Sequence, residues 1–517
     1  MRGLRAGAAV VAAVLLAGGA GGCTLVSPGD EDQGPITVGT TDTVTSLDPA
    51  GAYDAGSWAL FSNVYQSLLT YAPGTGSPVP DAADRCGFQG KDLRTYRCEL
   101  REGLKFGNGR ELTAEDVKFS FDRILRIKSP QGPQSLLDTL ESVGTTGRTV
   151  TFRLRVPDAT FPFKIATGAG AIVDSSRYPA DRLRTGTEAD GSGPYALKGY
   201  RPRSVAELRP NKNYQGAVKH RGGDVTVHYF RDAATMSKAW KQRSLDVAGR
   251  LMPPSDIAAH SLSDTGVKLM ESAGSETRSM FFNLREGSPL KALPVRRAIA
   301  AVVDREALAR DVHRRTVEPL YSLIPQGLGG HTTSFFDLNP RPDPESARSA
   351  LSRAGITTPV RFTLAYSQGA ATDEEAALLE RQLESTGLFE VTTRHVEWTE
   401  FRQGYARGDY DAYCVGWLAD FPDPDNFTTP LVGRSSSFRT GYANPKVEQL
   451  IGATQDSSRR SGVSKDFRAI QEIIAQDVPV LPLWQKKDYV LSSASVSGTQ
   501  YLSDGTGQWR LWELGRL

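Results

Sequence analysis

The segment at residues 416–427, Gly-Trp-Leu-Ala-Asp-Phe-Pro-Asp-Pro-Asp-Asn-Phe, combines three aspartates, two prolines and three aromatic residues. The prolines fix φ and remove backbone donors, so they hold the chain in one extended, turn-rich path. The aromatic side chains need cover, which brings the neighbouring carboxylates toward a protected site. A carboxylate beside aromatic walls is suited to bind a ligand ammonium group. We therefore expect Asp420 to bind a ligand, and Asp423 and Asp425 to cap turns of the loop.

Four cysteines occur, at positions 23, 86, 98 and 414. Cys86 and Cys98 flank a turn-rich stretch, and residues 96–100 alternate like a strand, which indicates a hairpin. We therefore predict a Cys86–Cys98 disulfide, which an exported compartment permits. Cys414 lies in an apolar, strand-like run and is expected to be a buried free thiol.

The first 23 residues have the pattern of an export signal. Arg2 and Arg5 form a positive region, and residues 6–17 are uncharged and mostly apolar. This run is shorter than the ~20 residues that span a bilayer but fits a signal-peptide core. Small residues then lead to Cys23, which resembles a bacterial lipobox with a lipidated cysteine, although Ala20 stands where leucine is typical.

These features predict a signal peptide over residues 1–22 and a lipid-anchor tether over residues 23–35. The protein would be exported and anchored to the outer face of the cytoplasmic membrane through lipidated Cys23. The alternative is a plain secretory signal with an incidental cysteine.

Length and charge limit the classes of protein to which this chain can belong. The 517 residues correspond to roughly three domain-sized units of ~150 residues. Lys and Arg number 61 against 59 Asp and Glu, a net charge of +2. Because no basic excess exists to bind phosphates, nucleic acid is not expected as a partner. The six histidines show no short ligand spacing, so neither a metal site nor a cofactor is expected.

The motifs of several enzyme classes are missing from the sequence. It contains no HExxH, GxSxG or GxxxxGK[ST] pattern. A carboxylate pair for glycoside hydrolysis stays an open alternative, because the two residues of such a pair have no fixed spacing in the sequence. We expect a binding protein rather than an enzyme.

Strands and helices are mixed along the chain, which indicates an α/β architecture with more than one lobe. A strand over residues 410–415 leads into the segment that holds Asp420. Further strands are expected at residues 36–40, 149–156, 195–200, 205–209, 225–230 and 389–396. Helices are expected at residues 58–69, from residue 113 onward, and at 295–303, 374–387 and 467–476.

Several segments together resemble the peptide-binding extracytoplasmic solute-binding proteins of ABC transporters, of the oligopeptide and dipeptide type. The segments are residues 47–50 (LDPA), 100–106 (LREGLKF), 112–117 (LTAEDV), 193–195 (GPY), 211–214 (NKNY), 296–300 (RRAIA), 304–306 (DRE), 417–427 and 479–484 (PVLPLW). They follow the family's order from about residue 36 to the C-terminus, so the resemblance covers nearly all of the mature chain.

The resemblance implies a two-lobed, periplasmic-binding-protein-like fold with two hinge crossings and an extra subdomain on the first lobe. Lobe one would comprise residues 36–57, 180–279 and 486–517, the subdomain residues 58–179, and lobe two residues 280–485. The crossings would lie near residues 276–283 and 482–486. The ligand would bind between the lobes, which close on it by a hinge motion.

The resemblance also implies roles for site residues. Asp420 would pair with the α-ammonium group of a peptide, and the main chain of Leu418 and Ala419 would bond to the peptide backbone. Trp417 and Trp398 would be walls of the site, with core packing an equal alternative for Trp398.

One departure from the family concerns the other end of the ligand. Dipeptide-specific members carry an arginine for the ligand carboxylate, but the corresponding residues 365–369 (AYSQG) include none. A longer peptide, or a ligand with a different tail, would fit better. The group that holds the far end stays open.

The resemblance implies that this protein binds peptides, oligopeptides among them, outside the cell membrane. Its partners would be the permease and ATPase subunits of an ABC importer and, through the lipid anchor, the membrane, and we expect a monomer. The alternatives are a carrier of a non-peptide solute such as nickel or haem, a peptide-sensing receptor of the same fold, or a secreted hydrolase.

Overall fold

The computed structural model describes residues 34–250, 252–260, 266–367, 369, 371–434, 436–503 and 505–517. Residues 35–517 form one compact unit. The predicted signal peptide, most of the tether and the predicted lipidation site Cys23 lie outside the described residues. Within the described ranges, no helix has the length and apolar character needed to cross a membrane.

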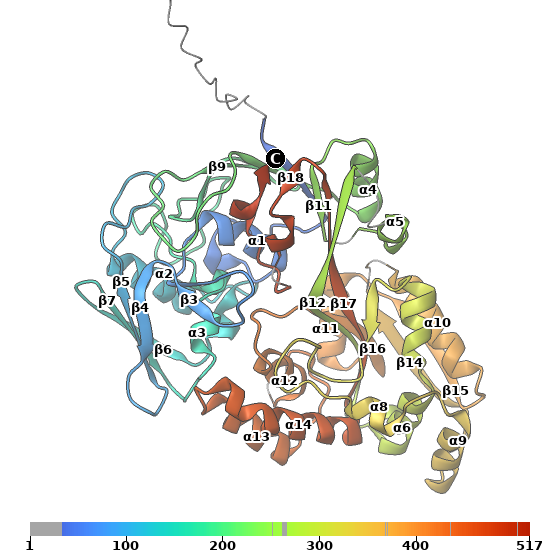
Figure 1. The fold of residues 1–517 in the computed structure, drawn as a ribbon. Coiled ribbons are helices and arrows are strands. Elements are labelled where there is room, and N and C mark those ends of the chain that lie inside the picture. The colour runs from blue at the N-terminus through green and yellow to red at the C-terminus, as the bar shows by residue number, and fades with distance from the viewer. Residues whose placement is uncertain are drawn as a thin grey trace, which may run out of the picture. The chain divides into compact units, whose positions relative to one another are not determined.

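A mixed eleven-stranded sheet runs through the described part of the chain (Figure 1). The strand order is β15, β14, β16, β12, β17, β11, β1, β10, β9 and β8, and β13 pairs with β17. In chain order these strands are β1 (Ile36–Thr40), β8 (Tyr195–Arg201), β9 (Val205–Pro210), β10 (Val225–Tyr229), β11 (Val247–Gly249), β12 (Val267–Phe282), β13 (Val317–Pro319), β14 (Val360–Tyr366), β15 (Phe389–His395), β16 (Ala412–Trp417) and β17 (Val480–Ser493).

The two longest strands, β12 and β17, lie side by side and antiparallel at the middle of the sheet (Figure 1). Residues 267–273 of β12 pair with residues 487–493 of β17, and residues 277–281 pair with residues 480–485. The register shifts between Ala273 and Thr277. A Cβ at Gly274 would lie only 2.6 Å from the Lys486 carbonyl oxygen, so glycine permits this close approach.

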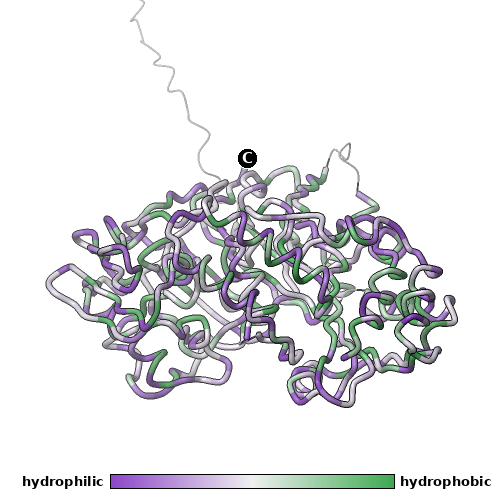
Figure 2. The backbone as a smooth tube through the Cα atoms, turned by 90° about the horizontal axis from the view of Figure 1, so that it is seen from below, coloured by the Kyte–Doolittle hydropathy of each residue, from purple (hydrophilic) through white to green (hydrophobic). Residues whose placement is uncertain are grey.

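Two large hydrophobic clusters lie on the two sides of this register shift. One is formed mainly by residues 36–247 and 490–514, which we call the first lobe. The other is formed by residues 280–484, the second lobe. Figure 2 shows hydrophobic stretches within both lobes and hydrophilic residues in many of the outer loops. The sheet thus passes from one core to the other through β12 and β17, as the expected pair of crossings requires.

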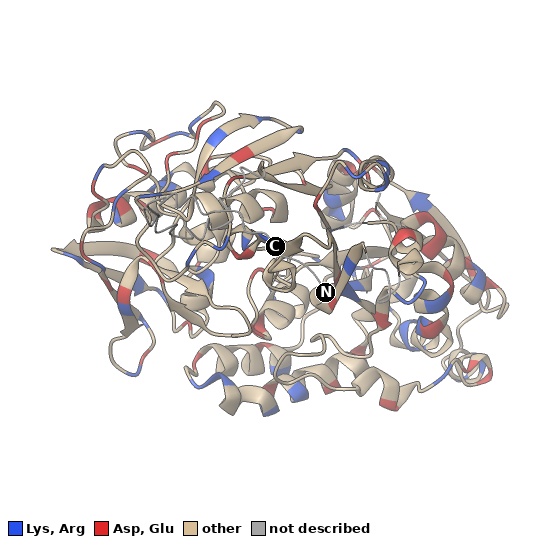
Figure 3. Ribbon diagram, turned by 45° about the horizontal axis from the view of Figure 1, so that its top comes forward, with Lys and Arg blue, Asp and Glu red and all other residues tan. Residues whose placement is uncertain are grey.

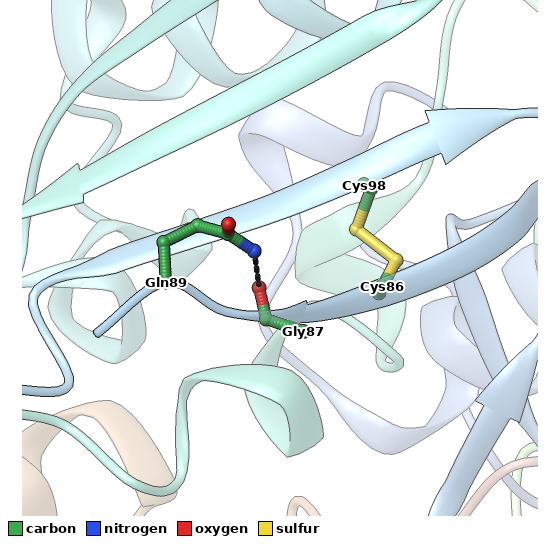
Figure 4. The surroundings of a disulfide bond; sticks show 4 residues. All are labelled: Cys86, Gly87, Gln89 and Cys98. Carbon is green, nitrogen blue, oxygen red and sulfur yellow. Dashed lines mark hydrogen bonds between the residues drawn. A yellow bond between two sulfur atoms is a disulfide. The ribbon is translucent and has the colours of Figure 1, made fainter. Parts of the chain in front are cut away.

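An antiparallel sheet forms a subdomain of the first lobe, with helix α2 (Ala114–Ile127) against it. Its strand order is β4 (Ala83–Phe88), β5 (Thr95–Leu100), β7 (Thr149–Leu154) and β6 (Leu140–Thr146). The helix starts with the capping box of Thr113 and Asp116. Cys86 and Cys98 are opposite each other on β4 and β5 and form a disulfide (Figure 4). The predicted disulfide and the predicted helix start are therefore confirmed.

The other larger helices divide between the two lobes. Those of the first lobe are α1 (Ala55–Val64), α4 (Ala233–Lys241) and α5 (Pro254–Ala259). Those of the second lobe are α6 (Leu293–Val302), α8 (Ser334–Leu338), α9 (Pro344–Arg353), α10 (Thr372–Glu384), α11 (Trp398–Arg407), α12 (Asp425–Val432), α13 (Pro445–Gln455) and α14 (Ser464–Asp477).

Two predicted boundaries are wrong for local reasons. The helix expected at residues 58–69 is α1, which starts earlier because the Asp54 carboxylate caps it at the Ser57 N–H, and residues 69–71 form strand β2 (Leu69–Tyr71). The loop expected at 416–427 is shorter, because β16 extends to Trp417 and α12 begins at Asp425. Cys414 on β16 is a buried free thiol, as predicted.

Charged residues of both signs are interspersed along the ribbon (Figure 3). This distribution agrees with the net charge of +2.

Candidate ligand-binding site

Asp420 follows the end of strand β16, and the side chain of Asn426 fixes its position. The Asn426 Oδ1 atom accepts hydrogen bonds from the Asp420 backbone N–H at 2.9 Å and from the Trp417 Nε1–H at 3.2 Å. Its Nδ2 group donates to the Asp420 carboxylate at 3.0 Å. One amide at the start of α12 therefore orients both the carboxylate and the indole that were predicted to meet a ligand.

The Asp420 carboxylate is buried where the two lobes approach each other. Its residue is 9% exposed, and the hydroxyl group of Tyr53, from the first lobe, donates to it at 2.8 Å. Among the described residues, no Lys, Arg or His forms an ion pair with it. Burial raises the pKa of Asp420 to about 6, although the hydrogen bonds from Asn426 and Tyr53 and the more distant charge of Lys164 act in the opposite direction. This carboxylate can accept an ammonium group.

The two neighbouring aspartates are already satisfied. The Nη2 group of Arg460 donates to Asp423 and to Asp425, each at 2.7 Å, and its Nε donates to Asp423 at 2.8 Å. Asp423 also accepts the backbone N–H of Asp425 at 2.9 Å, so it caps the turn as expected. Both carboxylates stabilise the loop, and Arg460 is the partner that the sequence did not identify.

The remaining predicted residues lie around this loop in different ways. Trp417 is half-buried, and its ring packs on Phe438 with centroids 5.9 Å apart. Leu418 is half-buried and Ala419 is buried. Trp398 is 45% exposed at the start of α11, which excludes core packing.

Leu418 brings the loop against the first lobe. A Cβ added at Gly507 would lie 3.1 Å from the Leu418 Cδ2 atom. Phe421 likewise packs on Phe163 of the subdomain, with ring centroids 6.0 Å apart. The lobes therefore meet at this loop, and Asp420 lies where they meet.

A cavity of about 270 Å³ lies at the crossing of β12 and β17. Residues of both lobes line it. They are Gly249, Arg250, Met252, Pro254, Ile257, Glu276, Arg278, His313, Thr316, Val317, Gly369, Thr372, Gly416, Trp484, Lys486, Lys487, Asp488, Tyr489, Val490, Leu502, Ser503 and Trp509. The lining includes Gly416, the residue before Trp417, but none of residues 417–420.

Behind this cavity, Glu375 of helix α10 is held by three donors. Its carboxylate accepts from the Arg278 Nε–H at 2.8 Å and the Trp484 Nε1–H at 2.5 Å, and His313 Nε2 lies 3.1 Å away. Burial alone would raise the pKa of Glu375, but Arg278 and His313, with the Trp484 hydrogen bond, hold it at about 2. All three partners line the cavity, so Glu375 fixes a part of its wall.

The other cations of the cavity are also paired. Arg250 binds Asp42 at 2.8 Å, Lys486 binds Glu276 at 3.2 Å, and Lys487 binds Glu271 and Glu318 at 3.1 and 2.7 Å. The cavity is therefore rich in charge, and most of this charge is neutralised within the protein.

The stretch at residues 365–369, which contains no arginine, reaches the cavity. Ala365 and Tyr366 end strand β14, and Gly369 lines the cavity. Gln368 lies outside the described residues. Arg278 on β12 lines the same cavity.

Sequence reasoning missed three residues of the site. Asn426 stood within the segment at 416–427 but was given no role. Arg278 carried a signal, because it is a charge two residues before the buried run Met280 to Phe282 and beside a predicted crossing. Tyr53 carried no signal, since only the tertiary fold brings it to Asp420.

Comparisons with known proteins agree with this architecture. The family described as bacterial extracellular solute-binding proteins, family 5 (middle region), matches residues 77–438. The probable D,D-dipeptide-binding periplasmic protein DdpA of Escherichia coli is 25% identical over 480 residues, with 90% of each chain covered. Heme-binding protein A of Haemophilus influenzae is 24% identical over 481 residues, with 86% of this chain and 85% of that protein covered.

A solved structure shows the same fold. The dipeptide binding protein from Pseudoalteromonas sp. SM9913, in complex with Met-Leu, has a TM-score of 0.78 at 19% identity, with 94% of this chain and 100% of that chain covered. The predicted two-lobed α/β fold is thereby confirmed. The family match spans well over half of the sequence and sets the hydrolase alternative aside, because the family consists of solute-binding proteins. The chain belongs to the bacterial extracellular solute-binding proteins of family 5.

Proposed function

We propose that this protein binds peptides, oligopeptides among them, outside the cell membrane and delivers them to the permease and ATPase subunits of an ABC importer. One observation carries the proposal: the Asp420 carboxylate is buried where the two lobes meet and has no ion-pair partner among the described residues. A peptide α-ammonium group would supply the missing charge. The name of the Escherichia coli relative, a probable D,D-dipeptide-binding protein, supports a ligand of this class.

The loop around Asp420 would also hold the peptide backbone. In this proposal the main-chain groups of Leu418 and Ala419 bond to it as a neighbouring strand would, which tolerates many side chains. Trp417 and the exposed ring of Trp398 are the walls of the site. We propose the same division into lobes as the resemblance implies. Lobe one comprises residues 36–57, 180–279 and 486–517, its subdomain residues 58–179, and lobe two residues 280–485.

A lipid anchor would keep the protein near its membrane importer. We propose that Cys23 is lipidated and that the monomeric protein is tethered by residues 23–35 to the outer face of the cytoplasmic membrane. Mass spectrometry of the membrane fraction would detect a diacylated N-terminal peptide that begins at Cys23. Release of unmodified protein into the medium would contradict the anchor.

Titration calorimetry with a pool of di- to pentapeptides tests the role of Asp420. Asp420→Asn should cost ~3–5 kcal/mol of peptide affinity, because it leaves the ligand ammonium unpaired in a closed site. This corresponds to about two to four decades in Kd. Asp425→Asn is the matched control, since Asp423 still holds Arg460, and it should leave peptide affinity within about twofold. Equal affinity of wild type and Asp420→Asn would refute the proposal.

The heme-binding relative is the reason to test a non-peptide ligand. Native mass spectrometry of the protein as purified separates these alternatives. A mixture of short peptides would support the proposal, and one defined non-peptide mass would overturn it. Growth on a peptide as sole amino-acid source, with and without this protein, separates import from sensing.

A further inference from the structure

We propose that the subdomain of the first lobe is a latch for the second lobe: its residues 158–164 contact Phe421 and the end of helix α13. This interlobe latch holds the lobes together and slows the release of a ligand bound at Asp420. The effect on ligand release rests on the proposed function, whereas the contact itself can be tested without a ligand.

Phe421 belongs to the second lobe by sequence and to the first lobe by packing. It lies between β16 and α12, and Ala419 and Phe427 on either side of it are buried in the cluster of the second lobe. Phe421 is 2% exposed and is instead part of the hydrophobic cluster of the first lobe. Its ring packs on that of Phe163, with centroids 6.0 Å apart. Separation of the lobes would return this apolar surface to water, which disfavours the open arrangement.

A backbone hydrogen bond is a second contact from the same segment of the subdomain. The N–H group of Ala159 donates to the carbonyl oxygen of Gln455, the last residue of α13, at 2.9 Å. Figure 1 shows helix α3 (Phe161–Lys164) next to this end of α13. Both contacts lie outside β12 and β17, the strands through which the chain crosses between the lobes. They are therefore an additional link, which a hinge motion about the crossing would have to break.

Bonds within the subdomain fix its half of the latch. The Asp158 carboxylate accepts the backbone N–H of Thr160 at 3.0 Å and the Thr160 hydroxyl group at 2.6 Å. It also forms a buried ion pair with the Lys164 Nζ group at 2.7 Å. The turn that presents Ala159 and Phe163 to the second lobe is thus held at both ends by one carboxylate.

Bonds within the second lobe fix the other half. The Thr454 hydroxyl group donates to the Asp425 carboxylate at 2.8 Å, and the Gln455 side chain donates to Thr429 of α12 at 3.2 Å. The end of α13 is therefore tied to the segment that carries Phe421. Because both surfaces are ordered within their own lobes, their contact loses little conformational entropy when the lobes close.

The latch is coupled to the proposed ammonium site through the sequence, since Phe421 directly follows Asp420. With Phe421 packed on the first lobe, the Asp420 carboxylate lies 2.8 Å from the Tyr53 hydroxyl group of that lobe. A ligand enters when the lobes are apart and is held when they are together, so the latch favours the arrangement that retains it. A weaker latch should raise the dissociation rate of the ligand without lowering its association rate.

Hydrogen exchange of the ligand-free protein, read at single residues, tests the contact itself. In Phe421→Leu, the Ala159 amide should exchange about five- to tenfold faster than in wild type, because the lobes separate more often. The amide of Ile165 is the internal control. It donates to the Phe161 carbonyl oxygen at 3.1 Å within the subdomain, so its exchange rate should not change.

Stopped-flow tryptophan fluorescence with tri-, tetra- and pentaalanine measures ligand release. Phe421→Leu and Phe163→Leu should each raise the dissociation rate by about three- to tenfold. The double variant should raise it no further than the larger single effect, because both substitutions remove the same contact. Phe161→Leu is the matched control; its ring packs on Tyr96 and Phe152 inside the subdomain, so it loses a comparable core contact and should keep the wild-type dissociation rate.

The outcomes that would overturn the inference are distinguishable. An unchanged exchange rate of the Ala159 amide in folded Phe421→Leu would overturn the latch. Faster exchange there, with equal dissociation rates in Phe421→Leu and Phe161→Leu, would overturn its role in ligand release while peptide binding stands. Failure of all three peptides to bind would overturn the proposed function, and the Ala159 exchange rate would still decide whether the latch exists.

Discussion

Two buried carboxylates of the second lobe have opposite environments. Asp420 is 9% exposed and Glu375 is 1% exposed, so both have lost most of their contact with water. Glu375 is bonded to Arg278, His313 and Trp484, and its pKa is about 2. Within the described part of the chain, Asp420 receives only the neutral donors Asn426 and Tyr53 at hydrogen-bond distance, and its pKa is about 6. The two carboxylates are similarly buried, but Glu375 has charged partners and the hydrogen-bond partners of Asp420 are neutral.

This difference separates a structural carboxylate from one that can bind a ligand. A charge that is paired within the protein contributes to stability and orients its partner, here Arg278. A buried carboxylate without a cation lowers the stability of the unliganded protein, and a ligand cation can recover that free energy. Asp423 supports the distinction, because it shares the loop of Asp420 but is held by two donors of Arg460.

The largest effect is expected when the paired carboxylate loses its charge. Glu375→Gln keeps the shape of the side chain but leaves Arg278 buried without a counter-charge. We expect a loss of ~3–5 kcal/mol in the free energy of unfolding at pH 7, measured by urea denaturation. The loss should shrink as the pH falls from 4.5 toward about 2, since Glu375 of the unfolded wild-type protein then takes up a proton that folding must release. An unchanged unfolding midpoint at pH 7 would show that the pair does not stabilise the fold.

Replacement of the unpaired carboxylate of Asp420 by an amide should instead raise the free energy of unfolding of the unliganded protein. The pKa of Asp420 is raised from 3.8 to about 6 in the folded protein. Ionised Asp420 therefore destabilises the unliganded fold above pH 6, by about 3 kcal/mol at 1.36 kcal/mol per pH unit. Asp420→Asn should be more stable than wild type above pH 6, and the gain should disappear below pH 4.

Urea denaturation of the ligand-free proteins at pH 4 and pH 8 checks this second prediction. Asp423→Asn is the control, because Asp423 is held by Arg460 and accepts the backbone N–H of Asp425, so its replacement should not stabilise the fold. If Asp420→Asn proved less stable than wild type at pH 8, ionised Asp420 would not destabilise the fold, and the contrast with Glu375 would be wrong.

Local features of the sequence directed attention to one side of this comparison, where the ligand-binding role of Asp420 stays a prediction. Asp420 follows a strand within a segment dense in aromatic residues and proline, and Cys86 and Cys98 flank a hairpin, so short-range spacing predicted both. The Glu375 cluster could not be predicted in this way. His313 is 62 positions before Glu375, and Trp484 is 109 positions after it. Sequence patterns report periodicity and turns, but they do not report which distant side chains meet.

The affinity for peptide should depend on pH through Asp420. Only the ionised carboxylate can pair with an ammonium group, and the pKa of Asp420 in the unliganded protein is about 6. Below pH 6 the affinity should therefore fall, by up to tenfold for each pH unit. Calorimetry from pH 4.5 to pH 7.5 measures this slope, with the peptide amine protonated throughout most of the range. A peptide affinity that is constant across this range would contradict an unpaired Asp420.

The smallest effect concerns the hydroxyl group that links the first lobe to Asp420. Tyr53 donates to the Asp420 carboxylate and favours its ionised form. Tyr53→Phe removes this donor without changing the shape of the ring, at a cost of ~1 kcal/mol to the ionised state. The midpoint of the pH dependence of peptide affinity should therefore move above pH 6, by less than about one pH unit. Tyr65→Phe, which removes a buried hydroxyl group bonded to Leu47 and Tyr178 rather than to Asp420, is the control and should leave the midpoint in place. A midpoint that stays at its wild-type value in Tyr53→Phe would show that the Asp420 charge depends on its own lobe alone, through Asn426, and not on the lobe that closes over it.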